Sequence, residues 1–179
     1  MDSNGCLTPS PAVACASGQV CDNLTDKCGP CTYNFECGDA QVCQTGGCVN
    51  ATGLTYRFTF YSAKVPEKDE NGYAWDPGGG LPDVQACLYL NCGADGCGND
   101  ALVGCTKGDS DTLSPLWVEH VDTKVFASDS VSVLLYDVDF SSDDYMTGAT
   151  WKSSVALLHS GSFNSTLSND KYKLFFTVE

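Results

Sequence analysis

The chain is poor in positive charge and has no long apolar run. Its 179 residues include 9 Lys and Arg against 23 Asp and Glu, which gives a formal charge of −14. A surface that binds nucleic acid must neutralise phosphates with basic groups, so the composition argues against that function. No apolar run reaches the length of a membrane-spanning helix, and no convincing helical periodicity is present. We therefore expect an all-β chain.

Histidine is also scarce. His120 and His159 are the two histidines, and neither lies near a nucleophile motif such as Gly-x-Ser-x-Gly. Paired carboxylates can hydrolyse glycosides. Carboxylates clustered in acidic loops, however, lack the apolar pocket that raises the pKa of a catalytic acid. We therefore expect no enzymatic activity.

Cysteine, in contrast, is abundant, and its twelve residues form two groups. The first group is Cys6, Cys15, Cys21, Cys28, Cys31, Cys37, Cys43 and Cys48, and the second is Cys87, Cys92, Cys97 and Cys105. An even number in each group favours disulfides, and hence a secreted, extracellular or cell-surface protein. Zinc is the alternative, but the spacings form no pair of Cys-x-x-Cys knuckles. In the second group we predict two bridges, one of them local, between Cys92 and Cys97.

Residues 1–50 form a cysteine-rich module with too few apolar residues for a core, so covalent cross-links must replace one. It contains two four-cysteine units, in which the segments 15–21 and 37–43 resemble each other and both end in Gln-Val-Cys. Four cysteines allow three pairings, and the sequence does not choose between them. Our working prediction pairs the first with the third and the second with the fourth in each unit.

After a linker at residues 50–53 the pattern changes to a period of two. Leu54, Tyr56, Phe58 and Phe60 alternate with other residues, as in a strand with one buried face. Further strands are predicted at Val84–Leu90, Ala101–Thr106, Leu116–Val125, Val131–Tyr136, Ser153–Leu158 and Tyr172–Val178. Short strands separated by polar turns favour an antiparallel sandwich. We therefore predict that residues 54–179 form a second part, a β-sandwich.

The densest run of like charge directly follows the predicted strand Val131–Tyr136. Asp137, Asp139, Asp143 and Asp144 fall within eight residues. Each carboxylate raises the cost of ionising the next. A hard divalent cation such as calcium takes about six to eight oxygen ligands and turns that repulsion into attraction. The pattern therefore favours a calcium site, and a merely solvated acidic loop is the alternative.

A second acidic region, residues 67–83, follows the first predicted strand. If that strand lies beside the fifth, Val131–Tyr136, the two acidic loops emerge at the same end of the sandwich. The carboxylates that could then converge on one or two cations are Asp76, Asp83, Asp137, Asp139 and Asp144. Three further carboxylates fit solvated positions better, namely Asp69, Asp109 and Asp111.

Four stretches, in this order, resemble the C2 domain family, and together they cover about residues 54–179. They are Tyr56–Ala63, which is similar to a core strand; Asp76–Asp83 followed by Val84–Leu88; Thr112-Leu113-Ser114-Pro115-Leu116-Trp117-Val118-Glu119, which is similar to Thr-x-Asn-Pro-x-Trp-x-Glu; and Asp137-x-Asp139 through Met146. The resemblance implies an eight-stranded antiparallel sandwich that binds calcium with loops at one end. The strand order favours the circular variant in which the first calcium loop follows the first strand.

The resemblance also implies a ligand set. Asp76 and Asp83 would bind calcium from the first loop, with Asp69 as the alternative to Asp76. The third loop would contribute Asp137, the Val138 carbonyl, Asp139 and Asp144, with Asp143 beside them. In this loop the sequence is one residue shorter between Asp139 and Asp144 than the family pattern, and Thr147 intrudes before Gly148.

The function that the resemblance implies is binding, usually to phospholipid. Tyr73, Trp75, Phe140 and Tyr145 are predicted at or beside the loop tips, where apolar groups next to calcium suit insertion into a lipid interface. We expect an extracellular calcium-binding module that binds a surface in a calcium-dependent way, with phospholipid headgroups as the first candidate. The alternative is a secreted adhesion or assembly subunit in which calcium only rigidifies the loops and the partners are cell-surface proteins or glycans.

Three further motifs match the acceptor sequence for N-linked glycosylation. They are Asn23-Leu24-Thr25, Asn50-Ala51-Thr52 and Asn164-Ser165-Thr166. Such motifs have meaning only in a eukaryotic secretory host.

Overall fold

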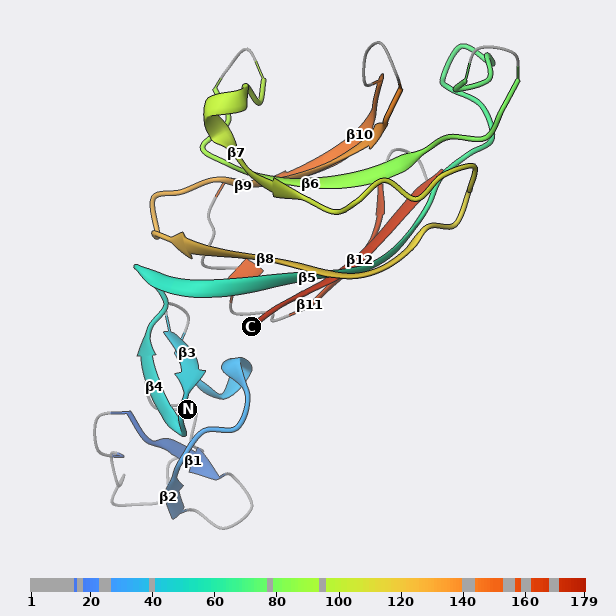
Figure 1. Ribbon diagram of the computed structural model, residues 1–179. Helices are drawn as coiled ribbons and strands as arrows, with labels where there is room; N and C mark the ends of the chain where they lie inside the picture. Colours follow the sequence, from blue (N-terminus) through green and yellow to red (C-terminus); the bar gives the residue numbers. More distant parts are fainter. Residues whose placement is uncertain are drawn as a thin grey trace.

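The computed structural model contains two antiparallel sheets of four strands each, stacked as a sandwich, and two small two-stranded sheets that precede them (Figure 1). It describes residues 15, 18–22, 27–38, 41–76, 79–93, 96–139, 144–152, 157–158, 162–167 and 171–179. The prediction of an all-β chain with an eight-stranded antiparallel sandwich is confirmed. Within these residues, no helix has the length and apolar character needed to cross a bilayer.

Two hairpins form the N-terminal module. They are β1 (Val20–Asp22) with β2 (Lys27–Gly29), and β3 (Gln41–Gln44) with β4 (Gly47–Asn50); the 3-10 helix η1 (Asn34–Glu36) lies between them in sequence. Three disulfides hold them, Cys15–Cys28, Cys31–Cys43 and Cys37–Cys48. These pairs follow the first-with-third, second-with-fourth pattern that the sequence analysis predicts. The remaining predicted pair includes Cys6, which lies outside the described residues.

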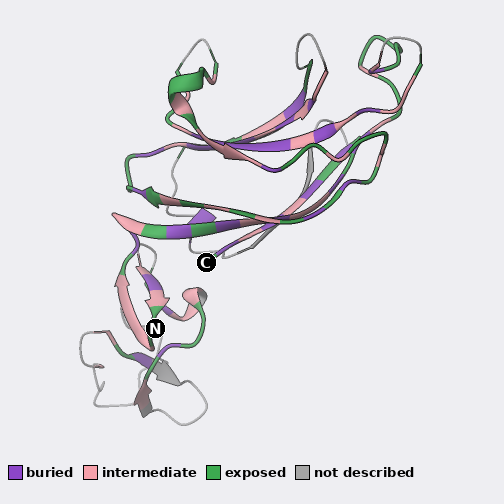
Figure 2. Ribbon diagram, in the orientation of Figure 1, coloured by how far each residue is buried: buried purple, intermediate pink, exposed green. Residues whose placement is uncertain are grey.

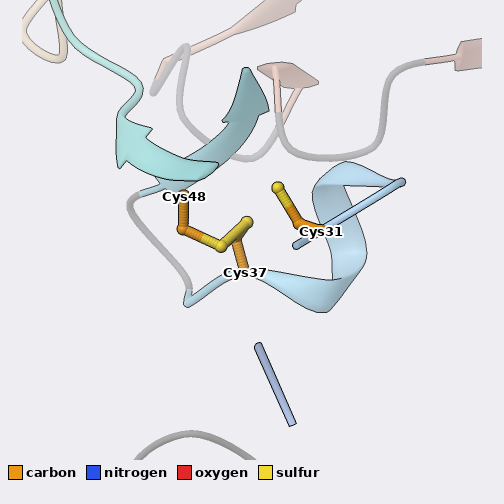
Figure 3. Close-up of side chains that lie close together, drawn as sticks. All are labelled: Cys31, Cys37 and Cys48. Atoms are coloured by element: carbon orange, nitrogen blue, oxygen red, sulfur yellow. A yellow bond between two sulfur atoms is a disulfide. The ribbon is translucent and has the colours of Figure 1, made fainter. Parts of the chain in front are cut away.

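Figure 3 shows Cys31, Cys37 and Cys48 close together in the second unit. Their sulfur atoms lie within 4.8 Å of one another, a spacing that a zinc site would also have. Each sulfur, however, is bound in a disulfide, and zinc requires thiolates. The cluster is therefore the packing of two bridges, which with the buried Val20 make a small core, and it does not bind zinc.

The module packs against the sandwich through a few specific contacts. Val42 of β3 belongs to the same buried cluster as the core of the sandwich. Asn34 donates a hydrogen bond from Nδ2 to the carbonyl oxygen of Leu158 (3.0 Å). Tyr56 donates from its hydroxyl to the carbonyl oxygen of Ala51 (2.7 Å), and both residues are buried. These contacts therefore hold the module and the sandwich together on either side of the linker at residues 51–53.

The first large sheet has the strand order β11–β12–β5–β8. Its strands are β11 (Ser162–Leu167), β12 (Tyr172–Val178), β5 (Leu54–Lys64) and β8 (Leu116–Val125). The predicted period of two is visible in β5, where Tyr56, Phe58 and Phe60 are buried (Figure 2). A strand that alternates in this way buries one face and leaves the other toward solvent.

The second large sheet has the strand order β10–β9–β6–β7. Its strands are β10 (Asp144–Trp151), β9 (Val131–Asp137), β6 (Val84–Leu90) and β7 (Leu102–Cys105). A disulfide, Cys87–Cys105, joins β6 to β7 where the two residues pair directly. Cys92–Cys97 closes the connection between these strands, which also contains the 3-10 helix η2 (Asn99–Ala101). Both bridges agree with the predicted pattern for the second group.

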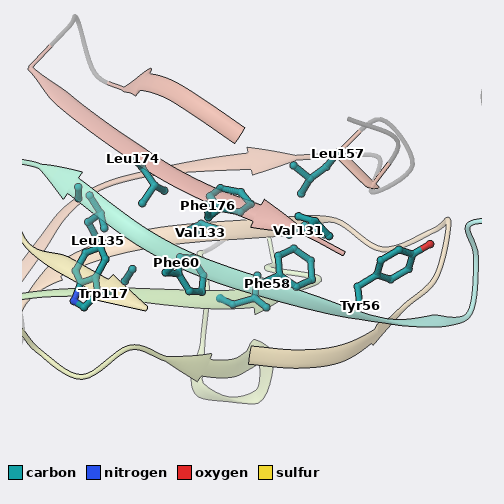
Figure 4. Packing of buried hydrophobic residues seen from close by; sticks show 14 of the residues in the cluster. Tyr56, Phe58, Phe60, Trp117, Val131, Val133, Leu135, Leu157, Leu174 and Phe176 are labelled. Carbon is teal, nitrogen blue, oxygen red and sulfur yellow. The ribbon is translucent and has the colours of Figure 1, made fainter. Parts of the chain in front are cut away.

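The core lies between the two sheets and is mainly aromatic on one side and aliphatic on the other (Figure 4). The ring of Phe176 packs against those of Phe58 and Phe60, with centroids 6.4 and 5.7 Å apart. Val131 and Val133 of β9 are fully buried. Burial of an aromatic or branched aliphatic side chain contributes about 1.5–3 kcal/mol each, so this cluster holds the sheets together without a metal.

The structure corrects the prediction of a strand at Ser153–Leu158. Leu157 and Leu158 are helical and buried, and residues 153–156 lie outside the described part. The strands of the sandwich that were not predicted from the sequence are β10 and β11. In β10 the alternation is broken by a bulge between Tyr145 and Thr147, which places Met146 and Thr147 both in buried positions. A bulge inserts one extra residue, so it hides the period of two.

The two ends of the sandwich differ in chemistry. β5 begins beside the N-terminal module and ends at Lys64, where the acidic loop 65–83 begins. Eleven residues in a strand span about 35 Å, so module and loop lie at opposite ends (Figure 1). We call the end formed by residues 65–83, 106–115 and the segment after β9 the acidic pole.

The loops meet at this pole for a different reason from the one expected. The first and fifth predicted strands, β5 and β9, lie in different sheets and are not neighbours. Asp83 instead directly precedes β6, and β6 pairs with β9, with Val84 opposite Asp137. The start of one strand and the end of its antiparallel neighbour necessarily lie at the same edge of the sheet.

Candidate metal centre

Asp137, the last residue of β9, is the central carboxylate of the acidic pole. It is fully buried, with 0% of its surface exposed. Its Oδ1 accepts a hydrogen bond from the backbone N–H of Asp83 (2.7 Å). Its Oδ2 is buried and has no hydrogen-bond partner among the residues that the structure describes. A buried carboxylate oxygen without a partner costs free energy, which a proton or a cation would recover.

The electrostatic surroundings of Asp137 point the same way. The pKa of this carboxyl is raised to about 6, first by burial and also by the negative charges of Asp76, Asp139 and Asp83. The hydrogen bond from the Asp83 N–H acts in the opposite direction. The folded chain therefore favours a positive partner at this position, whether a proton or a metal ion.

Five carboxylates of the described residues, Asp137 among them, form two overlapping triads that share Asp76. One triad is Asp76, Asp137 and Asp139, and the other is Asp76, Asp83 and Asp111; within each, one oxygen per residue lies within 4.8 Å of the others. Calcium–oxygen distances are about 2.3–2.6 Å, so two ligands on opposite sides of one ion lie about 4.6–5.2 Å apart. The spacing in each triad therefore fits one calcium ion, and Asp76 could bridge two.

Asp76 is shared by both triads. Burial raises its pKa, and the charges of Asp139 and Asp83 raise it further. The nearby Gly80 gives this carboxylate its space, because a Cβ at position 80 would lie 2.8 Å from Asp76 Oδ2. Asp69, the alternative ligand predicted from the sequence, belongs to a local turn, where its Oδ1 accepts hydrogen bonds from the N–H groups of Asn71 (2.9 Å) and Tyr73 (2.8 Å).

Asp111 is the residue that the sequence analysis missed, since it was assigned to solvent. It has a left-handed backbone conformation (φ 53), and its N–H donates to Asp83 Oδ1 (2.8 Å). The loop is held in place by paired backbone hydrogen bonds between Val84 and Asp109. Asp109 itself accepts a hydrogen bond from the N–H of Leu116 (3.0 Å). One feature of the sequence could have indicated this loop. The stretch Thr112–Glu119, which is similar to the Thr-x-Asn-Pro-x-Trp-x-Glu signature, directly follows Asp111.

The remaining predicted ligands lie around the triads. Val138 is half-buried and donates from its N–H to the carbonyl oxygen of Asp83 (2.9 Å), and the role of its own carbonyl stays a prediction. Asp144 pairs with Asp137 across β10 and β9, but it is exposed and belongs to neither triad. Asp143 lies outside the described residues.

The residues that were predicted to contact a membrane or partner differ in solvent exposure. Tyr73 is 72% exposed and Tyr145 is 58% exposed. Trp75 is 8% exposed, and its Nε1 donates to the carbonyl oxygen of Pro66 (2.9 Å). Its prediction as a surface contact is therefore wrong, because the indole folds back and finds its polar partner inside the loop. Phe140 lies outside the described residues.

Solved structures of C2-domain proteins share this fold. Extended-synaptotagmin 2, in a form with its SMP domain and two C2 domains, matches 70% of the chain with a TM-score of 0.53 and 18% identity, over 26% of that chain. A calcium-bound form of its two C2 domains matches 72% with a TM-score of 0.51 and 19% identity, over 45% of that chain. Human GIVD cytosolic phospholipase A2, in complex with an inhibitor and terbium chloride, matches 71% with a TM-score of 0.52 and 17% identity, over 17% of that chain.

The sandwich thus has the C2 fold, and at these identities the likeness shows the fold alone. This chain spans less than half the length of each of these three matched chains. A scan against protein-family models finds no match, and a search of curated proteins finds none either. The match to the phospholipase covers 17% of that enzyme, so the likeness does not carry its catalytic activity to this chain.

Proposed function

We propose that the C2-fold sandwich, residues 54–179, binds calcium at the acidic pole and, once loaded, binds a phospholipid surface. The observation that supports this most directly is the buried Oδ2 of Asp137, which has no hydrogen-bond partner within the described part of the chain. An oxygen of this carboxylate lies within 4.8 Å of carboxylate oxygens of Asp76 and Asp139. Carboxylate oxygens are the ligands that hard divalent cations prefer. The chain positions Asp83 and Asp137 at strand ends, where the backbone is fixed by pairing.

Calcium changes what the acidic pole can bind. Without a cation, the five clustered carboxylates repel an anionic headgroup. Calcium neutralises them and leaves coordination positions that phosphate or carboxylate oxygens of a headgroup can occupy. Tyr73 and Tyr145 are exposed at the same pole, and tyrosine is suited to the boundary between headgroups and acyl chains. These features favour phospholipid over a purely structural role for calcium.

The setting that we propose is extracellular or at the cell surface. Five disulfides among the described residues are typical of an oxidising compartment. We further propose that residues 1–50 are a separate, covalently cross-linked module. Because Val42 shares the core of the sandwich, we expect this module to stay docked when calcium is bound.

Co-sedimentation with vesicles tests the proposal. Vesicles of phosphatidylcholine with and without phosphatidylserine are mixed with the protein in calcium or in chelator. We expect binding in calcium only, and loss of binding in Asp137→Asn/Asp139→Asn. Asp100→Asn is the matched control, because Asp100 is an exposed carboxylate of η2, outside the acidic pole.

The same experiment separates the second candidate function. If calcium raises the melting temperature but no vesicle composition binds, calcium only rigidifies the loops and the partner is a protein or a glycan. Vesicle binding that persists in chelator would contradict the proposal that calcium bridges the protein to the surface.

A further inference from the structure

The end of the sandwich opposite the acidic pole carries a motif that calcium binding does not use. Asn50-Ala51-Thr52 joins β4 to β5 and has the Asn-x-Thr pattern of an N-glycosylation acceptor, with a residue other than proline in the middle. Asn50 is the last residue of β4 and is exposed. The acceptor side chain is therefore accessible in the folded chain.

The local geometry leaves the nitrogen of this side chain free. The backbone N–H of Thr52 donates to Asn50 Oδ1 (3.1 Å), which closes an Asx-turn. Within the described part of the chain, Asn50 Nδ2 makes no hydrogen bond. The turn therefore depends on the oxygen of the amide and would survive substitution at the nitrogen.

The other two residues of the motif, Ala51 and Thr52, are held in place by contacts with the sandwich. Ala51 is 1% exposed and its carbonyl oxygen accepts the hydrogen bond from Tyr56. Thr52 Oγ1 accepts a hydrogen bond from the N–H of Ala127 (2.7 Å). The backbone on both sides of the turn is thus held against the sandwich, and the Asn50 side chain lies on the solvent side of this joint.

Of the other two acceptor motifs, that of Asn23 lies outside the described residues. Asn164 lies within β11, where its backbone pairs with Phe175 of β12, so no turn is present around it. Only the motif at Asn50 combines an exposed asparagine with a turn among the described residues.

We propose that Asn50 is N-glycosylated when this chain passes through a eukaryotic secretory pathway. The donor would be a polyprenyl-diphosphate-linked oligosaccharide. A bond forms between Asn50 Nδ2 and C1 of the first sugar, the bond between C1 and the diphosphate oxygen breaks, and the polyprenyl diphosphate leaves while the amide loses one proton. The disulfides favour the type of compartment where this donor is available.

The position of Asn50 makes the modification compatible with calcium binding. Asn50 lies four residues before the start of β5, and the acidic pole begins after Lys64 at the far end of that strand. A glycan at Asn50 is bulky and hydrated, but it is about 35 Å away from the acidic pole along β5. We therefore expect the glycan to leave calcium affinity unchanged and to keep this end of the molecule in water.

The test uses the full chain behind a cleavable secretion signal in mammalian cells. The secreted protein is treated with peptide-N-glycosidase in ¹⁸O-water, which converts a glycosylated asparagine into labelled aspartate, and the peptide that contains Asn50 is examined by mass spectrometry. We expect the label at Asn50. Folded, secreted wild-type protein with an unlabelled Asn50 would overturn the proposal, whatever the state of the other two motifs.

Two variants sharpen the result. Asn50→Asp keeps the side-chain oxygen that closes the turn and removes the acceptor nitrogen, so it should lose one glycan on a gel. Thr52→Ser keeps both the hydroxyl and the acceptor motif and should retain that glycan. Unchanged mobility of Asn50→Asp would contradict the assignment. Calcium titration of the deglycosylated protein is a separate readout, so failure of the glycosylation proposal and failure of the calcium proposal are distinguishable.

Discussion

The N-terminal module and the acidic pole lie at opposite ends of β5 and are stabilised by different chemistry. The module has a small core, in which Val20 packs with the sulfurs of its bridges, and its shape is fixed by disulfides. The acidic pole gathers five carboxylates, which repel one another unless a cation neutralises them. The module is therefore held by covalent bonds in any oxidising solution, whereas the stability of the acidic pole depends on the pH and the cations of the solution.

Removing a disulfide from the module has the largest expected effect on stability without calcium. Cys37→Ala/Cys48→Ala opens a bridge between residues 11 apart in sequence. The free energy of unfolding should fall by about 2–4 kcal/mol, because the unfolded chain regains conformational freedom. Urea denaturation measures this loss. Calcium affinity should stay within about twofold of wild type, and a larger fall would show that the two ends are coupled.

Asp111→Asn should weaken calcium binding by about tenfold, or 1.4 kcal/mol, because it removes one carboxylate of the second triad. Asp144→Asn should change affinity by less than about threefold, since Asp144 belongs to neither triad. Isothermal titration calorimetry of the two variants compares them directly. The opposite order of effects would return Asp144 to the ligand set that the sequence analysis predicts.

The pH dependence should have opposite signs with and without calcium. The pKa of Asp137 is raised to about 6 in the folded chain, so between about pH 4 and 6 the folded state binds more protons than the unfolded state. Metal-free protein should therefore be less stable at pH 7.5 than at pH 5. In calcium the order should reverse, because calcium binds the deprotonated carboxylates.

Thermal denaturation at the two pH values, with calcium and with chelator, measures this effect. The carboxyls of Asp69 and Asp122, whose pKa values are lowered by their hydrogen bonds, stay ionised throughout this range and do not contribute. Asp137→Asn is the control, and the pH difference of the metal-free protein should shrink in it. An equal pH difference in this variant would assign the effect to other groups.

Gly80→Ala should have a smaller effect on calcium affinity than Asp111→Asn. A Cβ at this position would lie 2.8 Å from Asp76 Oδ2 and 3.0 Å from Asp76 Cβ. The carboxylate must therefore move to a poorer rotamer, at a cost of about 0.5–1.5 kcal/mol, and the Cβ of Asp76 must shift as well. Calcium affinity should fall about threefold, while stability in chelator stays close to wild type. Gly72→Ala, with open space around its Cβ but a left-handed φ of 85, is a control for backbone strain in the same loop. An unchanged affinity in Gly80→Ala would show that Asp76 moves freely.

The sequence predicted the parts of the fold that depend on short-range pattern. The alternation in β5 and the apolar runs of β6 and β9 follow from burial of one or both faces of a strand, so they were found. The strand β10 was missed because its bulge at Tyr145 and Thr147 interrupts the alternation. Leu157 and Leu158 were assigned to a strand because a short apolar run has no period of its own.

The candidate metal centre could likewise be predicted only where short-range pattern sets the position of a residue. Asp83 and Asp137 could be predicted together because each lies at a strand end. The neighbours that bring them together, β6 and β9, are not those that the sequence analysis assumed. Asp111 was missed because its place depends on long-range hydrogen bonds, which join Val84 to Asp109 and run from the Asp111 N–H to Asp83 Oδ1. Trp75 was misplaced because its partner, the Pro66 carbonyl, is a tertiary contact.

The central claim is that the buried carboxylate of Asp137 binds calcium, and one calorimetric experiment tests it most directly. Calcium is titrated into wild-type protein and into Asp137→Asn/Asp139→Asn, with Asp100→Asn as the control. We expect binding heat in wild type and in the control, and no binding heat in the double variant. Equal heats in all three proteins would contradict this claim, because the cation would then bind elsewhere.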